Sequence, residues 1–226
     1  MEQQHNERLP LELSSQLVSI MTTEHYTLQT GRSMTISEAN GRSSLFVGAV
    51  SSGLVALAFV GQISHLGTAF FVFSLVVLPT LLFMGLITFE RVLQSGSADI
   101  IYARGINRIR HLYLEYAPQM QPYFILSSHD DPGGKLEDLG VMHPSRWQVF
   151  FSMAGMVAMI TSVLAGSFVG LLLAAFTLPL AVTTSAGVVT FLVSISLHQR
   201  YQWRQWRQWM QLGRDLPAVF PSQPSE

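Results

Sequence analysis

The sequence contains no cysteine, so disulfide bonds and thiolate metal sites are excluded. Charged residues are also scarce, because they make up 12% of the 226 residues, about half the share typical of soluble domains. The formal net charge of −1 leaves no basic surplus for neutralising the phosphates of a nucleic acid. We therefore expect no nucleic-acid partner.

Two long stretches, residues 43–89 and 147–199, contain no Asp, Glu, Lys or Arg. About 20 apolar residues cross a bilayer, so each stretch is long enough to cross twice with a turn between. The first turn is expected at Gly61–Gly67, and the second near Pro179, which disfavours continued helix. A soluble bundle would carry charge on its outer faces, and these stretches carry none. The sequence predicts an all-α polytopic membrane protein with two transmembrane hairpins and four spans.

The distribution of charge divides the chain into five segments. Positive residues flank one end of each span, at Arg42, Arg91, Arg146 and Arg200, and by the positive-inside tendency that end is cytoplasmic. Both termini are then cytosolic. The expected segments are a cytosolic N-terminal helical segment (1–42), hairpin 1 (43–89), a cytosolic helix and loop (90–146), hairpin 2 (147–199), and an interfacial helix with a disordered tail (200–226).

Small residues recur at every fourth position in two spans, which lets helix backbones approach closely in lipid. We favour packing within the chain over packing between subunits. The third span carries Ala154, Ala158, Ser162, Gly166 and Gly170, and the first carries Gly48, Ser52 and Ala56.

The fourth span aligns Ala186, Thr190, Ser194 and His198 in a mildly polar stripe. The stripe fits a pore lining, but we favour hydroxyls bonded to carbonyls of their own helix, with His198 at the interface. In the second span Pro79 removes a backbone hydrogen bond and predicts a helix kink, for which a static bend is favoured over a gate hinge.

After Phe89 no proline occurs until Pro118, so the helix is expected to continue out of the membrane. It carries an apolar seam with alternating steps of four and three residues, the spacing of a coiled coil. A seam of this kind needs a partner, which is either another helix of the same chain or a neighbouring subunit. Its members are Tyr102, Ile106, Ile109, Tyr113 and Tyr116.

Residues 198–211, HQRYQWRQWRQWMQ, place tryptophans beside arginines just after the last span. On a helix the two sets occupy adjoining sectors, with indoles at headgroup level and guanidinium groups toward lipid phosphates. We interpret the stretch as a membrane anchor that contacts lipid, and not as a platform for base stacking. The anchoring residues are Arg200, Trp203, Arg204, Trp206, Arg207 and Trp209.

The remaining extramembrane segments are predicted to be less regular. Residues 9–20 are expected to form a short helix. A second helix, capped at Thr22 or Thr23, is expected to follow it, with a break at Asn40–Gly41. The tail from Pro217 is expected to be disordered.

No familiar catalytic or nucleotide-binding motif occurs, and no cofactor or metal is expected. A metal site is conceivable at His129, Asp130 and Asp131, but the neighbouring PGG favours an exposed, solvated loop. An embedded enzyme would need several of these residues to converge with His65 and His143, and the topology puts His65 on the far side.

The block TTEHYTLQTGRSMTISEANGRSSLFVGAVSSGLVALAFVGQ, together with ARGINRIRHLYLEYAP, resembles a group of bacterial four-span membrane proteins for which no activity is established. The resemblance implies a bacterial inner-membrane location. In outline, a span pair followed by a cytosolic helix is also similar to the two-span effector domains of bacterial nucleotide-signalling systems, from which the second hairpin departs.

Two functional hypotheses follow. The first is a non-enzymatic membrane protein whose cytosolic helices mediate assembly, as a homo-oligomer or with a protein partner. The alternative is an oligomeric pore lined by apolar and hydroxyl residues.

Overall fold

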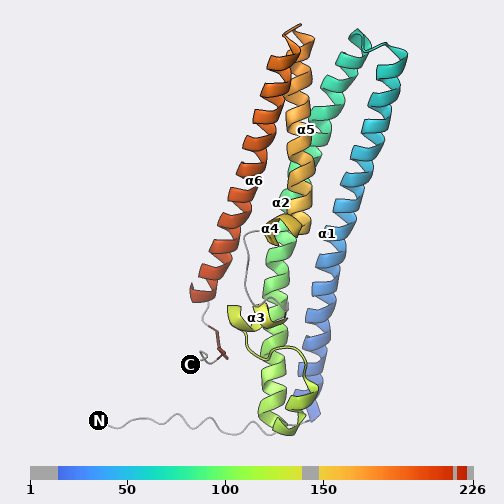
Figure 1. The fold of residues 1–226 in the computed structure, drawn as a ribbon. Coiled ribbons are helices and arrows are strands. Elements are labelled where there is room, and N and C mark those ends of the chain that lie inside the picture. Colours follow the sequence, from blue (N-terminus) through green and yellow to red (C-terminus); the bar gives the residue numbers. More distant parts are fainter. Residues whose placement is uncertain (1–14, 139–147, 216–217, 223–226) are drawn as a thin grey trace.

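The computed structural model describes residues 15–138, 148–215 and 218–222, and these contain helices and connecting segments but no strand. Two helices of 49 residues, α1 (Ser15–Ile63) and α2 (Thr68–Tyr116), form the first hairpin (Figure 1). Each is roughly 74 Å long at 1.5 Å per residue, more than twice the thickness of a bilayer core. The charge-free parts cross the membrane. Residues 15–42 and 90–116 project beyond it as an antiparallel pair, which we call the stalk.

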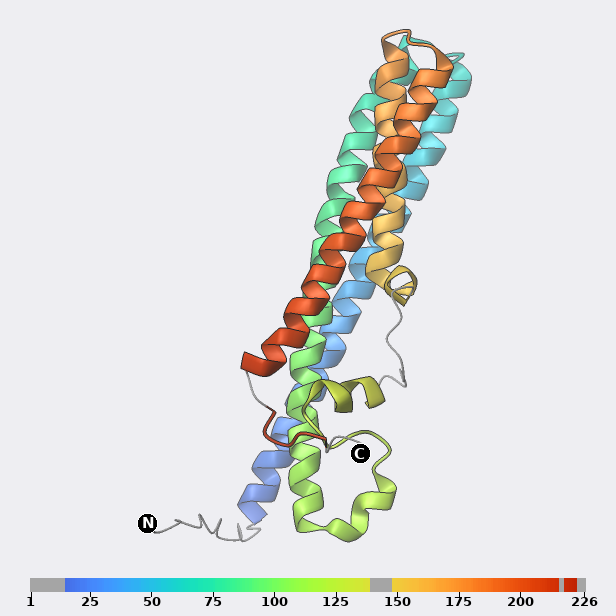
Figure 2. The same ribbon diagram turned by 60° about the vertical axis from the view of Figure 1, so that its left-hand side comes forward.

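The second hairpin consists of α5 (Met153–Ala175) and α6 (Leu180–Asp215). The helices α1, α2, α5 and α6 each contain a stretch long and apolar enough to cross a membrane. The chain is therefore a polytopic membrane protein with paired helices, as predicted. Three short elements complete the described chain: a 3-10 helix (Pro118–Tyr123), α3 (Pro132–Asp138) and α4 (Gln148–Phe151). Helix α4 lies crosswise where α5 begins (Figure 2).

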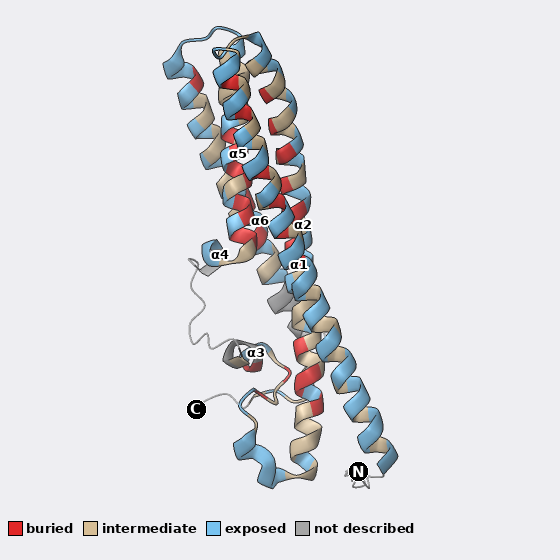
Figure 3. Ribbon diagram, turned by 90° about the vertical axis from the view of Figure 1, so that its right-hand side faces the viewer, coloured by how far each residue is buried: buried red, intermediate tan, exposed pale blue. Residues whose placement is uncertain are grey.

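Helices α2 and α5 join the two hairpins, because α2 packs against both α1 and α5 while α6 packs against α5. The core runs along these contacts, where Figure 3 shows buried residues in red. Phe46, Leu78 and Val157 are among them. Gly85 lies where three helices meet. A Cβ there would stand 2.5 Å from Oγ1 of Thr161 and 2.9 Å from the ring of Phe46, so only glycine fits without displacement.

Helix α1 is continuous from Ser15, which corrects the expectation of a separate second helix and of a break at Asn40–Gly41. Residues 9–14 of the first expected helix lie outside the described residues. Thr23 caps nothing, since its hydroxyl donates 2.8 Å to the carbonyl of Ser19 within the helix. No proline interrupts residues 11–78, and a glycine inside a helix costs only about 1 kcal/mol. Packing of α1 against α2 along the stalk offsets that cost.

The small-residue stripe of α5 lies in the contact with α6. Ala158 and Ser162 are fully buried, and a Cβ on Gly166 would stand 2.7 Å from the carbonyl oxygen of Gly187. The reciprocal approach, from Gly187 to the oxygen of Gly166, would be 2.9 Å. The two backbones therefore cross closely at this point, as small residues in membrane helices allow.

Two of the three stripe residues of α1 do not pack against the described part of the chain, contrary to the preference for contacts inside one subunit. Gly48 and Ser52 are exposed, and nothing lies within 4 Å of a Cβ built on Gly48. Ala56 is half-buried. Packing against α2 instead involves Gly53, where a Cβ would meet Leu81 at 2.8 Å. Bulky neighbours determine which face of α1 is buried, and spacing alone does not reveal them.

The polar stripe of α6, unlike the stripe of α1, faces the helix bundle. The hydroxyl of Ser194 donates 3.0 Å to that of Ser162 on α5, and Thr190 donates 2.8 Å to the carbonyl of Ala186. His198 is buried against the ring of Phe89 at 4.8 Å. The hydroxyl groups of the stripe thus donate hydrogen bonds to another hydroxyl or to a backbone carbonyl of their own helix. Pro79 lies inside continuous α2, and the kink there stays a prediction.

Candidate functional site

The apolar seam of α2 is covered by the N-terminal half of α1. Ile106 and Ile109 are buried, with 2% and 7% of their surface exposed. A Cβ on Gly31 would stand 2.8 Å from the ring of Tyr102, and the rings of His25 and Tyr113 are 6.0 Å apart. Tyr116, the last residue of α2, is half-buried. Of the two partners considered, the structure shows the chain's own helix.

An ion pair links the same two helices across the stalk. Nε of Arg32 donates 2.6 Å to Oδ1 of Asp99, and both side chains are largely shielded. Leu28 lies against Gly105, where a Cβ would stand only 2.9 Å from its side chain. The stalk is therefore held by close packing together with a charge pair, and it provides a firm support for the loop beside it.

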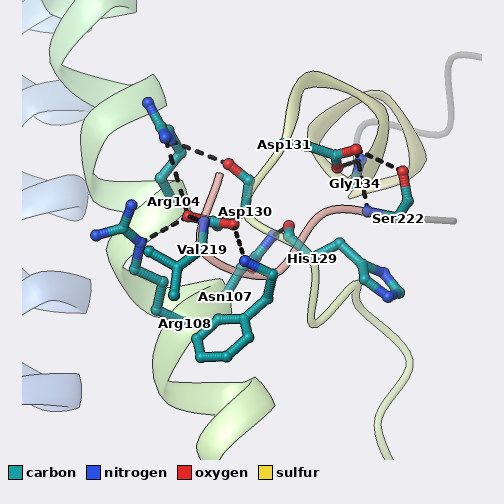
Figure 4. A network of polar contacts seen from close by, with 10 residues as sticks. Arg104, Asn107, Arg108, His129, Asp130, Asp131, Gly134, Val219 and Ser222 are labelled. Carbon is teal, nitrogen blue, oxygen red and sulfur yellow. Dashed lines mark hydrogen bonds and ion pairs between the residues drawn. The ribbon is translucent and has the colours of Figure 1, made fainter. Parts of the chain in front are cut away.

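That loop, residues 124–131, is anchored to the stalk by Asp130, whose side chain is fully buried (Figure 4). Nε of Arg108 donates 2.6 Å to Oδ2 of Asp130, and Nη2 of Arg104 lies 3.9 Å from the same oxygen. Nε of Arg104 also donates 3.0 Å to the backbone carbonyl of Asp130. A buried carboxylate is tolerated only with such partners. The arginines lie four residues apart, so they share one helix face.

A second set of bonds fixes the rest of the loop to α2. Nδ2 of Asn107 donates to the carbonyl of His129 at 2.9 Å and to Oδ2 of Asp138 at 3.0 Å. The other carboxylate oxygen of Asp138 accepts from the backbone N–H of Ser127 at 2.7 Å. Arg110 donates 2.9 Å to the amide oxygen of Asn107. The loop is therefore tied to α2 at several points.

Residues 218–222 of the tail dock on this loop. The N–H groups of Val219 and Phe220 donate to the Asp130 carboxylate at 3.2 and 2.9 Å (Figure 4). In return, the N–H of Asp130 donates 3.2 Å to the carbonyl of Phe220. For residues 218–222 this placement corrects the expectation of a disordered tail, whose other residues from Pro217 onward lie outside the described part of the chain. It also corrects the expectation of a solvated loop around Asp130. The partners are about 90 residues apart, so no local pattern revealed the contact.

Asp131 and His111 complete the contact with the tail. Oδ2 of Asp131 accepts from the N–H of Ser222 at 3.1 Å and from the Ser222 hydroxyl, while Oδ1 accepts from Gly134 N–H at 2.9 Å. The ring of Phe220 stacks on His111 at 3.8 Å between centroids. The carboxylates of Asp130 and Asp131 thus accept hydrogen bonds from backbone N–H groups of the tail, and the His111 ring stacks on the ring of Phe220.

The carboxylates are ionised near neutral pH. Burial by itself would raise the pKa of Asp130, but hydrogen bonds from Phe220 N–H, the Arg108 guanidinium and Val219 N–H hold that pKa below its ordinary value. Burial likewise opposes ionisation of Asp131, and bonds from Ser222 and Gly134 hold its pKa below the ordinary value. Both groups therefore act as acceptors for the tail.

The carboxylates of this loop bind protein donors. The described residues hold no cluster of three or more His, Cys, Asp or Glu side chains that would bind an ion. The oxygens of Asp130 and Asp131 already accept from protein donors. His65 belongs to the turn between α1 and α2, which lies at the opposite end of the bundle (Figure 1), and His143 is outside the described residues.

The flanking arginines differ in their surroundings. Arg42 pairs with Glu38 at 2.8 Å, and Arg91 donates 3.1 Å to Gln94. The arginines after the last span instead line a cavity with Trp203: Arg200, Arg204 and Arg207. Trp206 is half-buried. Arg146 and the side chain of Trp209 are outside the described part of the chain.

Comparison of the chain with models of protein families, with curated proteins and with solved structures found no significant match. The bacterial resemblance seen in the sequence is therefore not supported by a family assignment. Four helices that are long and apolar enough to cross a membrane remain the basis for assigning a class.

Proposed function

We propose that the chain is a non-enzymatic, multi-pass protein of the bacterial inner membrane whose stalk lies in the cytosol and binds an extended segment of a protein partner. The observation that carries the proposal is the way in which Asp130 and Asp131 bind residues 218–222. Their carboxylates accept hydrogen bonds from three backbone N–H groups. Sites that recognise extended peptides commonly combine main-chain bonds with an anchor side chain.

Selectivity for the segment comes from two side chains of the tail. Phe220 stacks on His111, and the hydroxyl of Ser222 donates to Asp131. A partner segment with an aromatic residue and a serine two positions later would make the same contacts. The chain's own tail then acts as an internal competitor, because tethering gives it an effective concentration in the millimolar range.

Binding of the tail in trans tests this function. The full-length variant F220D/S222A in lipid nanodiscs should release its own tail and bind a labelled peptide of residues 217–226, whereas the unmodified protein should bind it weakly. A peptide carrying Phe220→Asp is the matched control and should not bind. Absence of saturable binding to the released variant, with its helix content unchanged by circular dichroism, would contradict the proposal.

The arginines at one end of the spans, including Arg42 and Arg91, support the proposed cytosolic placement of the stalk. The absence of cysteine makes the orientation easy to test. Single cysteines at His65 and at Ile125 should react with an impermeant thiol reagent from opposite faces, position 125 only after the cells are opened. Labelling of position 125 in intact cells would reverse the topology.

Assembly through the Tyr102–Tyr116 seam is not part of the proposal, because α1 covers that seam. The pore alternative has also lost its main support. The hydroxyl stripe that would line a pore bonds to α5 and to its own helix through Ser194 and Thr190. Flux of ions or solutes through reconstituted protein would restore that alternative.

A further inference from the structure

A cavity of about 670 Å³ lies beside the part of α6 that leaves the membrane. Phe150 of α4 forms part of its wall, and α6 contributes Trp203 and three arginines, Arg200, Arg204 and Arg207. The volume falls within the range of small-molecule sites in proteins. Because the arginines follow one another at steps of four and three residues, they share one face of α6.

The three guanidinium groups form a concentrated positive charge. No carboxylate pairs with them among the side chains that the structure describes, whereas Arg32, Arg42 and Arg108 each contact an Asp or a Glu. On this part of α6 the Tyr201 hydroxyl donates to Glu90 and Gln202 donates to the Ser152 hydroxyl, and none of these residues lines the cavity. Like charges at this spacing repel, so an anion in the cavity would relieve the repulsion.

The position of the cavity along α6 points to lipid as the source of that anion. Residues 180–199 carry no charge and extend for roughly 30 Å, the thickness of a bilayer core. Arg200 therefore stands at the depth of the headgroups, and Arg204 and Arg207 follow within two turns. Phe150 and Trp203 add aromatic surface at the same level, where acyl chains meet the polar layer.

We propose that this cavity binds the phosphate headgroup of one anionic phospholipid. Arg200, Arg204 and Arg207 donate to the phosphate oxygens, since guanidinium groups form paired, charge-assisted bonds with phosphate. Phe150 and Trp203 flank the glycerol and the first acyl carbons. The site differs from a general basic flank because the three arginines line one cavity together with Phe150 and Trp203.

Native mass spectrometry of the full-length protein tests the proposal. The protein is released from nanodiscs of zwitterionic phosphatidylcholine that contain a minority of phosphatidylglycerol, and it should keep one bound phosphatidylglycerol molecule. This lipid should be retained at least about tenfold more often than its share of the bilayer predicts. Retention of the two lipids in their bulk ratio would overturn the proposal, and this readout needs no variant.

Variants then locate the bound lipid. R204Q/R207Q should lose most of the retained phosphatidylglycerol, while R91Q, at the edge of another span and outside the cavity, should retain it. Equal losses from both variants would mean diffuse attraction and would contradict a defined site. Inorganic phosphate at the concentration of the lipid should not displace it. Displacement would assign the cavity to a soluble phosphate and overturn the lipid assignment.

Discussion

The backbone N–H of Phe220 donates a 2.9 Å hydrogen bond to Oδ1 of Asp130, although 90 residues separate the two along the chain. The bond joins the C-terminal tail to a loop that is itself held by Arg104 and Arg108 of α2. The end of the chain is thereby connected to the stalk of the first hairpin, and the stability of this connection can be measured directly.

Removing the aromatic anchor should release the tail. In F220A the stacking on His111 is lost, and such contacts contribute about 0.5–1.5 kcal/mol beyond the buried area. The amides of Val219 and Ser222 should then exchange hydrogen roughly 2- to 10-fold faster. The control I125A removes a side chain that is 96% exposed and should leave exchange unchanged. Unaltered protection in F220A would show that the stacking does not hold the tail.

Acid should detach the tail only below the ordinary range of carboxyl pKa values. The folded-state pKa of Asp130 and of Asp131 lies below the unfolded value, so their stabilisation is present above about pH 3.9 and is lost as the pH falls through the lowered pKa values. Hydrogen exchange at Val219, measured from pH 7 down to about pH 2 and divided by the intrinsic exchange rate at each pH, follows the release. Release near pH 6 would point to a histidine instead.

The stalk should depend on the buried seam. Ile106→Ala deletes a side chain that is 2% exposed and should lower the free energy of unfolding by about 2–5 kcal/mol. Ile101→Ala on the same helix removes a side chain that is 59% exposed and should change stability little. Denaturant titration of both variants measures the difference. Since α1 covers the seam, I106A should leave the oligomeric state unchanged, and a shift to smaller assemblies would contradict the in-chain packing.

The crossing of α5 and α6 should not tolerate a large residue at Gly166. Gly166→Leu would force its Cβ toward the carbonyl of Gly187, at 2.7 Å, and overpacking of this kind costs about 1–3 kcal/mol. Gly48→Leu on exposed α1 is the matched control. Cysteines replacing Ser162 and Ser194, whose hydroxyl oxygens are 3.0 Å apart, report the crossing by disulfide formation. Cross-linking should fall in the Gly166 variant alone, and equal yields in both variants would mean that the helices separate without cost.

The membrane architecture was readable from the sequence because lipid imposes a simple requirement on it. Spans must be apolar over their whole circumference and about 20 residues long. Residues 43–89 and 147–199 therefore predicted two hairpins without any knowledge of packing. The continuation of α2 past Phe89 was equally readable, since no proline interrupts it before Pro118.

The partners of each helix face were decided only by tertiary structure. The four-residue spacing was the same on α1 and α5, yet Gly166 meets Gly187 while Gly48 meets nothing, because large neighbours such as Phe46 determine which face of a helix is buried. The seam of α2 was evident from Ile106 and Ile109, but its spacing fits any apolar partner, and only the fold showed that α1 is that partner.

The candidate site depended on tertiary structure most of all. Sequence alone determined that Asp130 and Asp131 sit in a polar loop, for which solvation is the ordinary outcome. Burial of Asp130 became favourable only when Arg108 and the N–H groups of Val219 and Phe220 converged on it. Such convergence joins three segments that are distant along the chain, and hydrogen bonds between distant segments leave no periodic pattern in a sequence.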